Sequence, residues 1–142
     1  MPRAVLDTNV LVSAVISQGK PRTLLGKGIA KQFSIVLSDF ILSELVRVLR
    51  RPRFETSEDE IHKIVLALMQ TGEVVNVRSR FRAVKDDPSD DAIVNTAHDG
   101  RADMIVTGDS HLLRLKSFKG IKIVSVSEAL QQLNECHVSA TL

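Results

Sequence analysis

The 142-residue sequence has little cysteine, few aromatic side chains and no long apolar run. A single cysteine, Cys136, excludes a disulfide within the chain and a zinc site built from several cysteines. With five Phe and neither Trp nor Tyr, extensive stacking on nucleic-acid bases is also excluded. No stretch approaches the roughly twenty apolar residues of a membrane span, and the first apolar run ends at Asp7, which is too early for a signal peptide. We therefore expect a cytoplasmic protein without membrane contact.

Hydrophobic residues make up 44% of the chain, which is enough for the core of one domain. We expect a single domain over residues 1–135, and a flexible tail over residues 136–142. The 19 basic and 17 acidic side chains leave a net charge of only +2. Net charge therefore favours neither an acidic nor a basic partner, and the distribution of charge has to decide.

Short, wholly apolar runs alternate along the chain with segments of helical spacing. The runs predict strands at residues 4–6, 34–37, 74–77, 104–106 and 121–125. Helices are predicted at residues 10–16, 20–31, 39–51, 58–70, 90–98, from 109, and at 127–133. Strands that are apolar along their whole length indicate a parallel sheet covered on both faces, so the sequence predicts an α/β sandwich.

Acidic residues follow two of the predicted strands. Asp7 comes after the first strand and Asp109 after the strand at 104–106, so both are expected at the carboxyl edge of the sheet, where such folds bind ligands. Asp91 lies in the first turn of a helix, and Glu44 borders the apolar stripe of another. Each has an alternative role: Asp7 and Asp109 as helix caps, Asp91 as a partner of the helix dipole, Glu44 as a surface residue.

The convergence of these carboxylates would require a cation. Two unit charges about 4 Å apart repel by about 4 kcal/mol at an effective dielectric of about 20. Ligation by carboxylate oxygens alone favours Mg²⁺ or Mn²⁺, and no Cys or His spacing competes for zinc.

Four segments, in this order and at these separations, resemble the acidic motifs of PIN-domain nucleases: "VLDTNVLVSA", "SDFILSELVRVL", "DPSDDAIVNTA" and "MIVTGDSHLL". The likeness extends from about Arg3 to Leu133. It implies a PIN-like three-layer sandwich with a five-stranded parallel sheet flanked by helices. It also implies that Asp7, Glu44, Asp91 and Asp109 hold one or two divalent ions. Asp91 is preferred to its neighbouring acids because "AIVNTA" follows it.

The resemblance is strongest to small prokaryotic proteins of the VapC type, the toxins of toxin-antitoxin pairs. It implies metal-dependent endoribonuclease activity on RNA that leaves 5′-phosphate and 3′-hydroxyl ends. It further implies an antitoxin protein as partner and pairing into a homodimer. Other polar residues of the motifs could assist the metal ligands, and an ordinary capping or loop role is the alternative for each. They are Asn9, Asp90, Thr107 and Ser110. His111 is left out, because a solvated helix histidine explains it better.

Basic side chains gather in "RVLRRPRF" and "RSRFRAVK", on either side of the predicted 58–70 helix. Such clusters bind phosphates, although solvated helix ends are an equal alternative. The candidate RNA contacts are Arg50, Arg51, Arg53, Arg78 and Arg80.

Three other functions compete with the nuclease. A receiver-like signalling module would need paired acids after the first strand and a lysine after the last, and the sequence has neither. A phosphohydrolase of small esters would need two aspartates spaced by one residue near the first strand, which are also missing. A PIN-like protein that binds or scaffolds RNA without catalysis stays open, although all the motif acids are intact.

Overall fold

The computed structural model describes residues 1–84 and 87–141, with side chains up to residue 134. In this part of the chain, six strands form one sheet in the order β3-β2-β1-β4-β6-β5. Every neighbouring pair is parallel except β5 with β6. The strands are β1 (Arg3–Leu6), β2 (Ser34–Leu37), β3 (Glu73–Val74), β4 (Met104–Val106), β5 (Ser117–Phe118) and β6 (Ile121–Val124).

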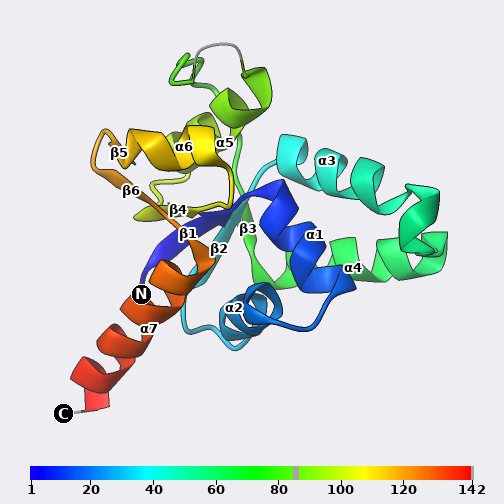
Figure 1. Cartoon of the computed structure of the whole chain (residues 1–142), viewed down its shortest axis with the longest axis horizontal. Helices are drawn as coiled ribbons and strands as arrows, with labels where there is room; N and C mark the ends of the chain where they lie inside the picture. Colours follow the sequence, from blue (N-terminus) through cyan, green and yellow to red (C-terminus); the bar gives the residue numbers. More distant parts are fainter. Residues whose placement is uncertain (85–86, 142) are drawn as a thin grey trace.

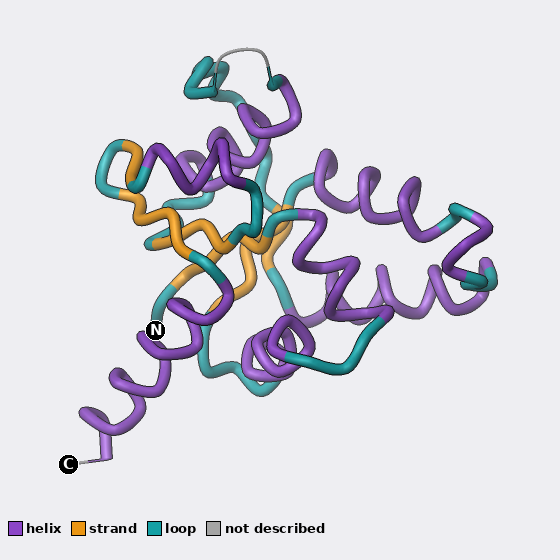
Figure 2. Tube along the Cα trace, in the orientation of Figure 1, coloured by secondary structure: helices purple, strands orange, loops and turns teal. Residues whose placement is uncertain are grey.

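Helices cover both faces of the sheet (Figures 1 and 2). From β1 the chain moves outward through β2 to β3, and it then returns to β4 on the other side of β1. Since such crossovers are right-handed, the return places α5 and α6 on the face opposite α1 and α2, as Figure 1 shows. The helices are α1 (Thr8–Ile16), α2 (Lys20–Ile29), α3 (Asp39–Leu49), the 3₁₀ helix η1 (Pro52–Phe54), α4 (Glu58–Thr71), α5 (Pro88–Asp99), α6 (Ser110–Leu115) and α7 (Val126–Thr141).

The core lies where these helices meet the central strands. Val5 and Leu6 of β1 and Ile105 and Val106 of β4 are completely buried, because α5 contacts both strands while α1 packs with α2 and α3 on the other face. Strands apolar on both faces therefore occupy the centre of the sheet, as the sequence pattern requires. The predicted α/β sandwich is confirmed.

Several boundaries differ from the prediction. The sheet has a sixth strand, β5, whose two residues are too few to leave a periodic signal. β3 ends at Val74, although the Val75 amide still donates to the Leu37 carbonyl at 2.8 Å. α5 begins at Pro88 with Asp87 as its cap, two residues before the predicted start at residue 90. The Asp87 carboxylate accepts from the Asp90 amide at 3.3 Å, and proline suits the first helical position.

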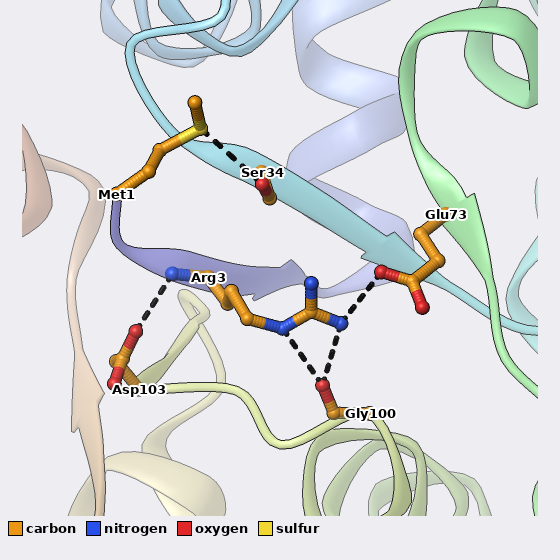
Figure 3. Close-up of polar contacts among 6 residues, drawn as sticks. All are labelled: Met1, Arg3, Ser34, Glu73, Gly100 and Asp103. Carbon is orange, nitrogen blue, oxygen red and sulfur yellow. Dashed lines mark hydrogen bonds and ion pairs between the residues drawn. The ribbon is translucent and has the colours of Figure 1, made fainter.

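At the amino edge of the sheet, Arg3 ties β1 to segments distant in sequence (Figure 3). Its guanidinium donates to the Gly100 carbonyl at 3.0 and 2.8 Å and pairs with Glu73 at 2.7 Å. Its amide donates to the Asp103 carboxylate at 2.8 Å. These contacts fix the starts of β1, β3 and β4 and leave the opposite, carboxyl edge to the polar residues described below.

The C-terminal helix α7 contacts α2 and extends away from the sheet (Figure 1). It continues to Thr141, beyond the end predicted near Leu133. The flexibility expected of residues 136–142 stays a prediction. None of the helices described is both long and apolar enough to cross a bilayer.

Candidate metal centre at the carboxyl edge of the sheet

The order of the strands reverses between β1 and β4, which are parallel neighbours. Ligands of open α/β sheets bind outside the carboxyl ends of the strands at such a switch point. Asp7 leaves β1 here, and the loop after β4 carries Thr107 and Asp109. The sequence predicted that these two aspartates share this edge, and the structure places both of them there.

A polar cavity of about 250 Å³ opens at this point, and we call it the acid pocket. Its lining comes from the starts of α1 and α5, from α3 and from the loop after β4. The acidic residues of this lining are Asp7, Glu44, Asp87, Asp90 and Asp109. Such a density of carboxylates is costly without a positive charge among them.

The carboxylate of Asp7 is hydrogen-bonded to a buried threonine. The Thr107 hydroxyl donates to Asp7 Oδ2 at 2.7 Å, and it accepts from the Asp109 amide at 3.0 Å. Asp7 occupies the cap position of α1, and its shortest side-chain hydrogen bond is the one from Thr107. Burial raises the pKa of Asp7, and the bond from Thr107 opposes this rise.

Asp90 has the most unfavourable surroundings of the pocket acids. Its side chain lies on the first turn of α5 with 5% of its surface exposed. Oδ2 is buried and has no hydrogen-bond partner among the described residues. Burial raises the pKa of Asp90 to about 7, with further contributions from the negative charge of Asp109 and from Asp87 and Asp7. A buried, unpartnered carboxylate oxygen that faces other acids is the donor that a cation would satisfy.

The structure does not bring Asp91 to the acid pocket, although the sequence favoured Asp91 over Asp90. Asp91 Oδ1 accepts from the Val84 amide at 2.8 Å. Asn95 and Asp99, four and eight residues later on the same face of α5, hold the preceding segment through Phe81, Arg78 and Ser79. Asp91 thus belongs to a stripe that fastens residues 78–84 to α5. Asp90, rotated by about 100° on the helix, faces the pocket instead.

Asp87 and His111, which were not among the predicted site residues, lie close to Asp90 and Asp109. Potential ligand atoms of Asp87, Asp90, Asp109 and His111 all lie within 4.8 Å of one another. Asp109 caps α6 by accepting from the His111 amide at 2.7 Å, and the imidazole Nδ1 lies 3.8 Å from its Oδ1. Asp109 therefore does act as a cap, and the capping turn carries His111 to the site. The "GDSH" sequence contained this signal, because a cap fixes the residue two positions later.

Glu44 lies half-buried in the acid pocket and forms an ion pair with Arg47, whose two nitrogens donate at 2.8 and 3.2 Å. Among the smaller candidates, Asn9 also lines the pocket, whereas Ser110 is exposed at the start of α6. Thr107 has the contacts with Asp7 and Asp109 given above.

The candidate RNA-binding arginines are in different situations. Arg51 is exposed and lines the acid pocket. Arg50 is held by Glu58 at 2.8 and 3.1 Å, and Arg53 stacks on Phe54 at 4.7 Å. Arg78 and Arg80 are exposed on the segment before α5. The structure thus directs only Arg51 of these five to the acids.

A cluster of acids at the switch point of a mostly parallel sheet defines an α/β protein with a candidate site for a cation. Comparison with protein families makes the assignment narrower. The model of the PIN domain matches residues 3–111, so the chain belongs to the PIN domain family, as predicted. Proteins of this family are nucleases, and the acidic group fits their use of divalent metals.

A solved structure has the same fold. It is a chain from the crystal structure of VapBC2 from Rickettsia felis bound to a DNA fragment from their promoter, with a TM-score of 0.62 and 14% sequence identity. The match covers 87% of this chain and 98% of that chain. A search of curated proteins gave no match.

Proposed function

We propose that this protein is a divalent-metal-dependent endoribonuclease that hydrolyses phosphodiester bonds of RNA. The observation that carries the proposal is Asp90 Oδ2, which lies buried beside Asp109 in a pocket of acids and has no hydrogen-bond partner in the part of the chain that the structure describes. Asp7, Asp90 and Asp109 would hold Mg²⁺ or Mn²⁺, with Asp87 and His111 beside them. Asp90 thereby takes the role that the motif resemblance gave to Asp91.

A bound divalent ion would polarise phosphate oxygens and lower the pKa of a coordinated water. The side chains around it have separate tasks. Thr107 fixes the orientation of the Asp7 carboxylate. Glu44, steadied by Arg47, is placed to orient an attacking water, and Arg51 is placed to contact the RNA backbone. In-line attack of this water would leave a 5′-phosphate and a 3′-hydroxyl.

We further propose that the nuclease is the toxin of a toxin-antitoxin pair and acts in the cytoplasm. The fold shared with a chain of VapBC2 supports this role, because that structure is an assembly bound to promoter DNA. The partner would be an antitoxin protein that blocks the acid pocket. Family likeness also makes a homodimer the expected assembly.

The test is cleavage of end-labelled single-stranded RNA by the purified chain. We expect cleavage with Mg²⁺ or Mn²⁺, none with EDTA, and loss of about a thousandfold or more in Asp7→Asn. Calorimetric titration with Mn²⁺ would separately report whether the ion binds. Cleavage that persists in EDTA would contradict the proposal. Tight RNA binding without cleavage under any metal would instead identify an RNA-binding PIN protein.

A further inference from the structure

A second cavity, of about 420 Å³, lies directly beside the acid pocket, and we call it the side pocket. Phe40 lines both cavities. The first turn of α5 also contributes to both, with Pro88 in the side pocket and Asp90 in the acid pocket. A ligand whose reacting group occupies the acid pocket can therefore extend past Phe40 into the side pocket.

The lining of the side pocket combines apolar side chains with several polar ones. Phe40 and the side chains of Val75 and Val77 provide the apolar part. Asp39 and Asn76 are exposed polar side chains of the lining, and Arg80 adds a positive charge. The volume of this pocket lies in the range of small-ligand sites.

Residues 78–81, which include the part of the side pocket opposite α3, are fixed by hydrogen bonds to α5. The Asn95 side chain accepts a hydrogen bond from the Phe81 backbone amide at 2.8 Å and donates one to the Phe81 carbonyl at 3.1 Å. The Asp99 carboxylate accepts from the amides of Arg78 and Ser79. A preformed wall lowers the entropic cost of binding, which supports a role in recognition.

We propose that the side pocket binds one unpaired nucleobase of the RNA next to the cleaved phosphate, with preference for a base that carries an exocyclic amino group. This inference rests on the proposed ribonuclease function for the identity of the substrate. The ring of Phe40 offers a stacking surface, which is how proteins hold unpaired bases. The Asp39 carboxylate is an acceptor that suits an amino donor such as cytosine N4, and Arg80 suits the adjoining phosphate.

The base preference follows because the Asp39 carboxylate can only accept hydrogen bonds. Cytosine and uracil differ at position 4, where cytosine has an amino donor and uracil a carbonyl acceptor. A carboxylate at Asp39 pairs with the first and repels the second. An asparagine at this position has both a donor and an acceptor, so it would accommodate either base.

The experiment is an NMR titration of the ¹⁵N-labelled full chain with cytidine and uridine 5′-monophosphates in EDTA. We expect amide shifts at residues 38–40 and 75–81, and binding of the cytidine nucleotide about tenfold tighter. Asp39→Asn should bring the two affinities within about twofold. Asp59→Asn is the matched control, because Asp59 is also an exposed aspartate in the first turn of a helix, and it should keep the wild-type ratio.

Three results would overturn the inference: equal affinities for the two nucleotides in the wild type, shifts confined to residues outside the side pocket, or an Asp39→Asn variant that keeps the wild-type ratio. Circular dichroism would verify that both variants are folded. The titration contains no metal and requires no cleavage. An inactive protein that still prefers the cytidine nucleotide would refute the ribonuclease and leave the pocket assignment intact, whereas an active enzyme without this preference would do the reverse.

Discussion

Thr107 and Asp7, one hundred residues apart in the sequence, share a buried hydrogen bond of 2.7 Å at the base of the acid pocket. The bond joins the ends of β1 and β4, and the same hydroxyl also accepts a hydrogen bond from the Asp109 amide. One threonine thus orients the carboxylate of Asp7 and fixes the backbone of Asp109, two residues proposed to hold the metal. Groups that orient metal ligands in this way contribute to affinity without touching the ion.

Thr107→Val keeps the shape of the side chain and removes both hydrogen bonds. We expect metal affinity and cleavage to fall by about 10- to 100-fold. Unfolding should become easier by about 1 to 3 kcal/mol, because the Asp109 amide loses its acceptor. Thr107→Ser should restore affinity and activity. Mn²⁺ calorimetry and RNA cleavage measure these effects, and an unchanged Mn²⁺ affinity in the valine variant would contradict the role given to Thr107.

Adjacent aspartates of α5 are expected to behave differently. Asp90→Ala should lose cleavage by about a thousandfold or more, because it removes a carboxylate that faces the proposed ion. Asp91→Ala should retain cleavage within about tenfold and lose about 1 kcal/mol of stability, since the Val84 amide loses its acceptor. Cleavage kinetics and urea denaturation of the two variants separate these effects. The opposite ranking would return the third acid to Asp91.

The sequence predicts Asp7 and Asp109 well because each follows a buried strand, and the carboxyl ends of parallel strands meet at one edge. It does not distinguish Asp90 from Asp91. Neighbouring helical residues differ by about 100° in direction, so the choice depends on how α5 is rotated against the sheet. That rotation is set by tertiary contacts of the helix, among them the hydrogen bonds of Asp91, Asn95 and Asp99 with the segment before it.

Cavities are also beyond what a linear pattern can indicate. Phe40 reads in the sequence as part of an apolar helix, and only the packing of α3 beside α5 and the segment after β3 places its ring between two pockets. The strand β5 was missed for a related reason. Its two residues pair with β6 through backbone bonds that carry no side-chain periodicity.

Stability should depend on pH in a direction set by Asp90. Its pKa of about 7 in the folded protein lies above the ordinary value of 3.8, so the folded state binds more protons between these pH values. Without metal, this carboxyl therefore lowers stability as the pH rises from about 4 to about 7. Burial is the largest cause of the raised pKa of Asp90, and the facing acids Asp109, Asp87 and Asp7 add to it.

Asp90→Asn removes this charge and should raise the melting temperature in EDTA at pH 8, by an amount equivalent to about 1 kcal/mol. The difference from wild type should shrink toward pH 5, where Asp90 is protonated. Added Mn²⁺ should stabilise the wild type more than the variant. Thermal melts across this pH range provide the measurement, and a variant less stable than wild type at pH 8 would refute the assignment of a destabilising charge.

His111 should influence which metal is bound. Its imidazole lies with three carboxylates, and nitrogen ligands suit Mn²⁺ better than Mg²⁺. His111→Ala is expected to weaken Mn²⁺ binding by about tenfold and to change Mg²⁺ binding much less. His62→Ala, on the exposed face of α4, is the control. Equal losses for both ions would show that His111 acts through the shape of the loop and does not ligate.

The adjacent arginines at the end of α3 provide a test of the RNA surface. Arg51 lines the acid pocket, whereas Arg50 is engaged by Glu58 through two hydrogen bonds. A side chain that contacts phosphate displaces a counterion from RNA, so its loss reduces the salt dependence of binding. Arg51→Gln should therefore lower the slope of log affinity against log salt by about 0.7, and Arg50→Gln should leave it unchanged. Both changes remove one positive charge, which makes them matched.

The slope is best measured in the Asp7→Asn background, where RNA stays intact during fluorescence anisotropy. Glu58→Gln completes the set, since it releases Arg50 from its ion pair. If Arg50 is silent only because Glu58 holds it, this third variant should bind RNA more tightly and with a steeper salt dependence. Equal slopes for the Arg50 and Arg51 variants would mean that both sense RNA only through the general field of the protein, and the backbone contact assigned to Arg51 would be wrong.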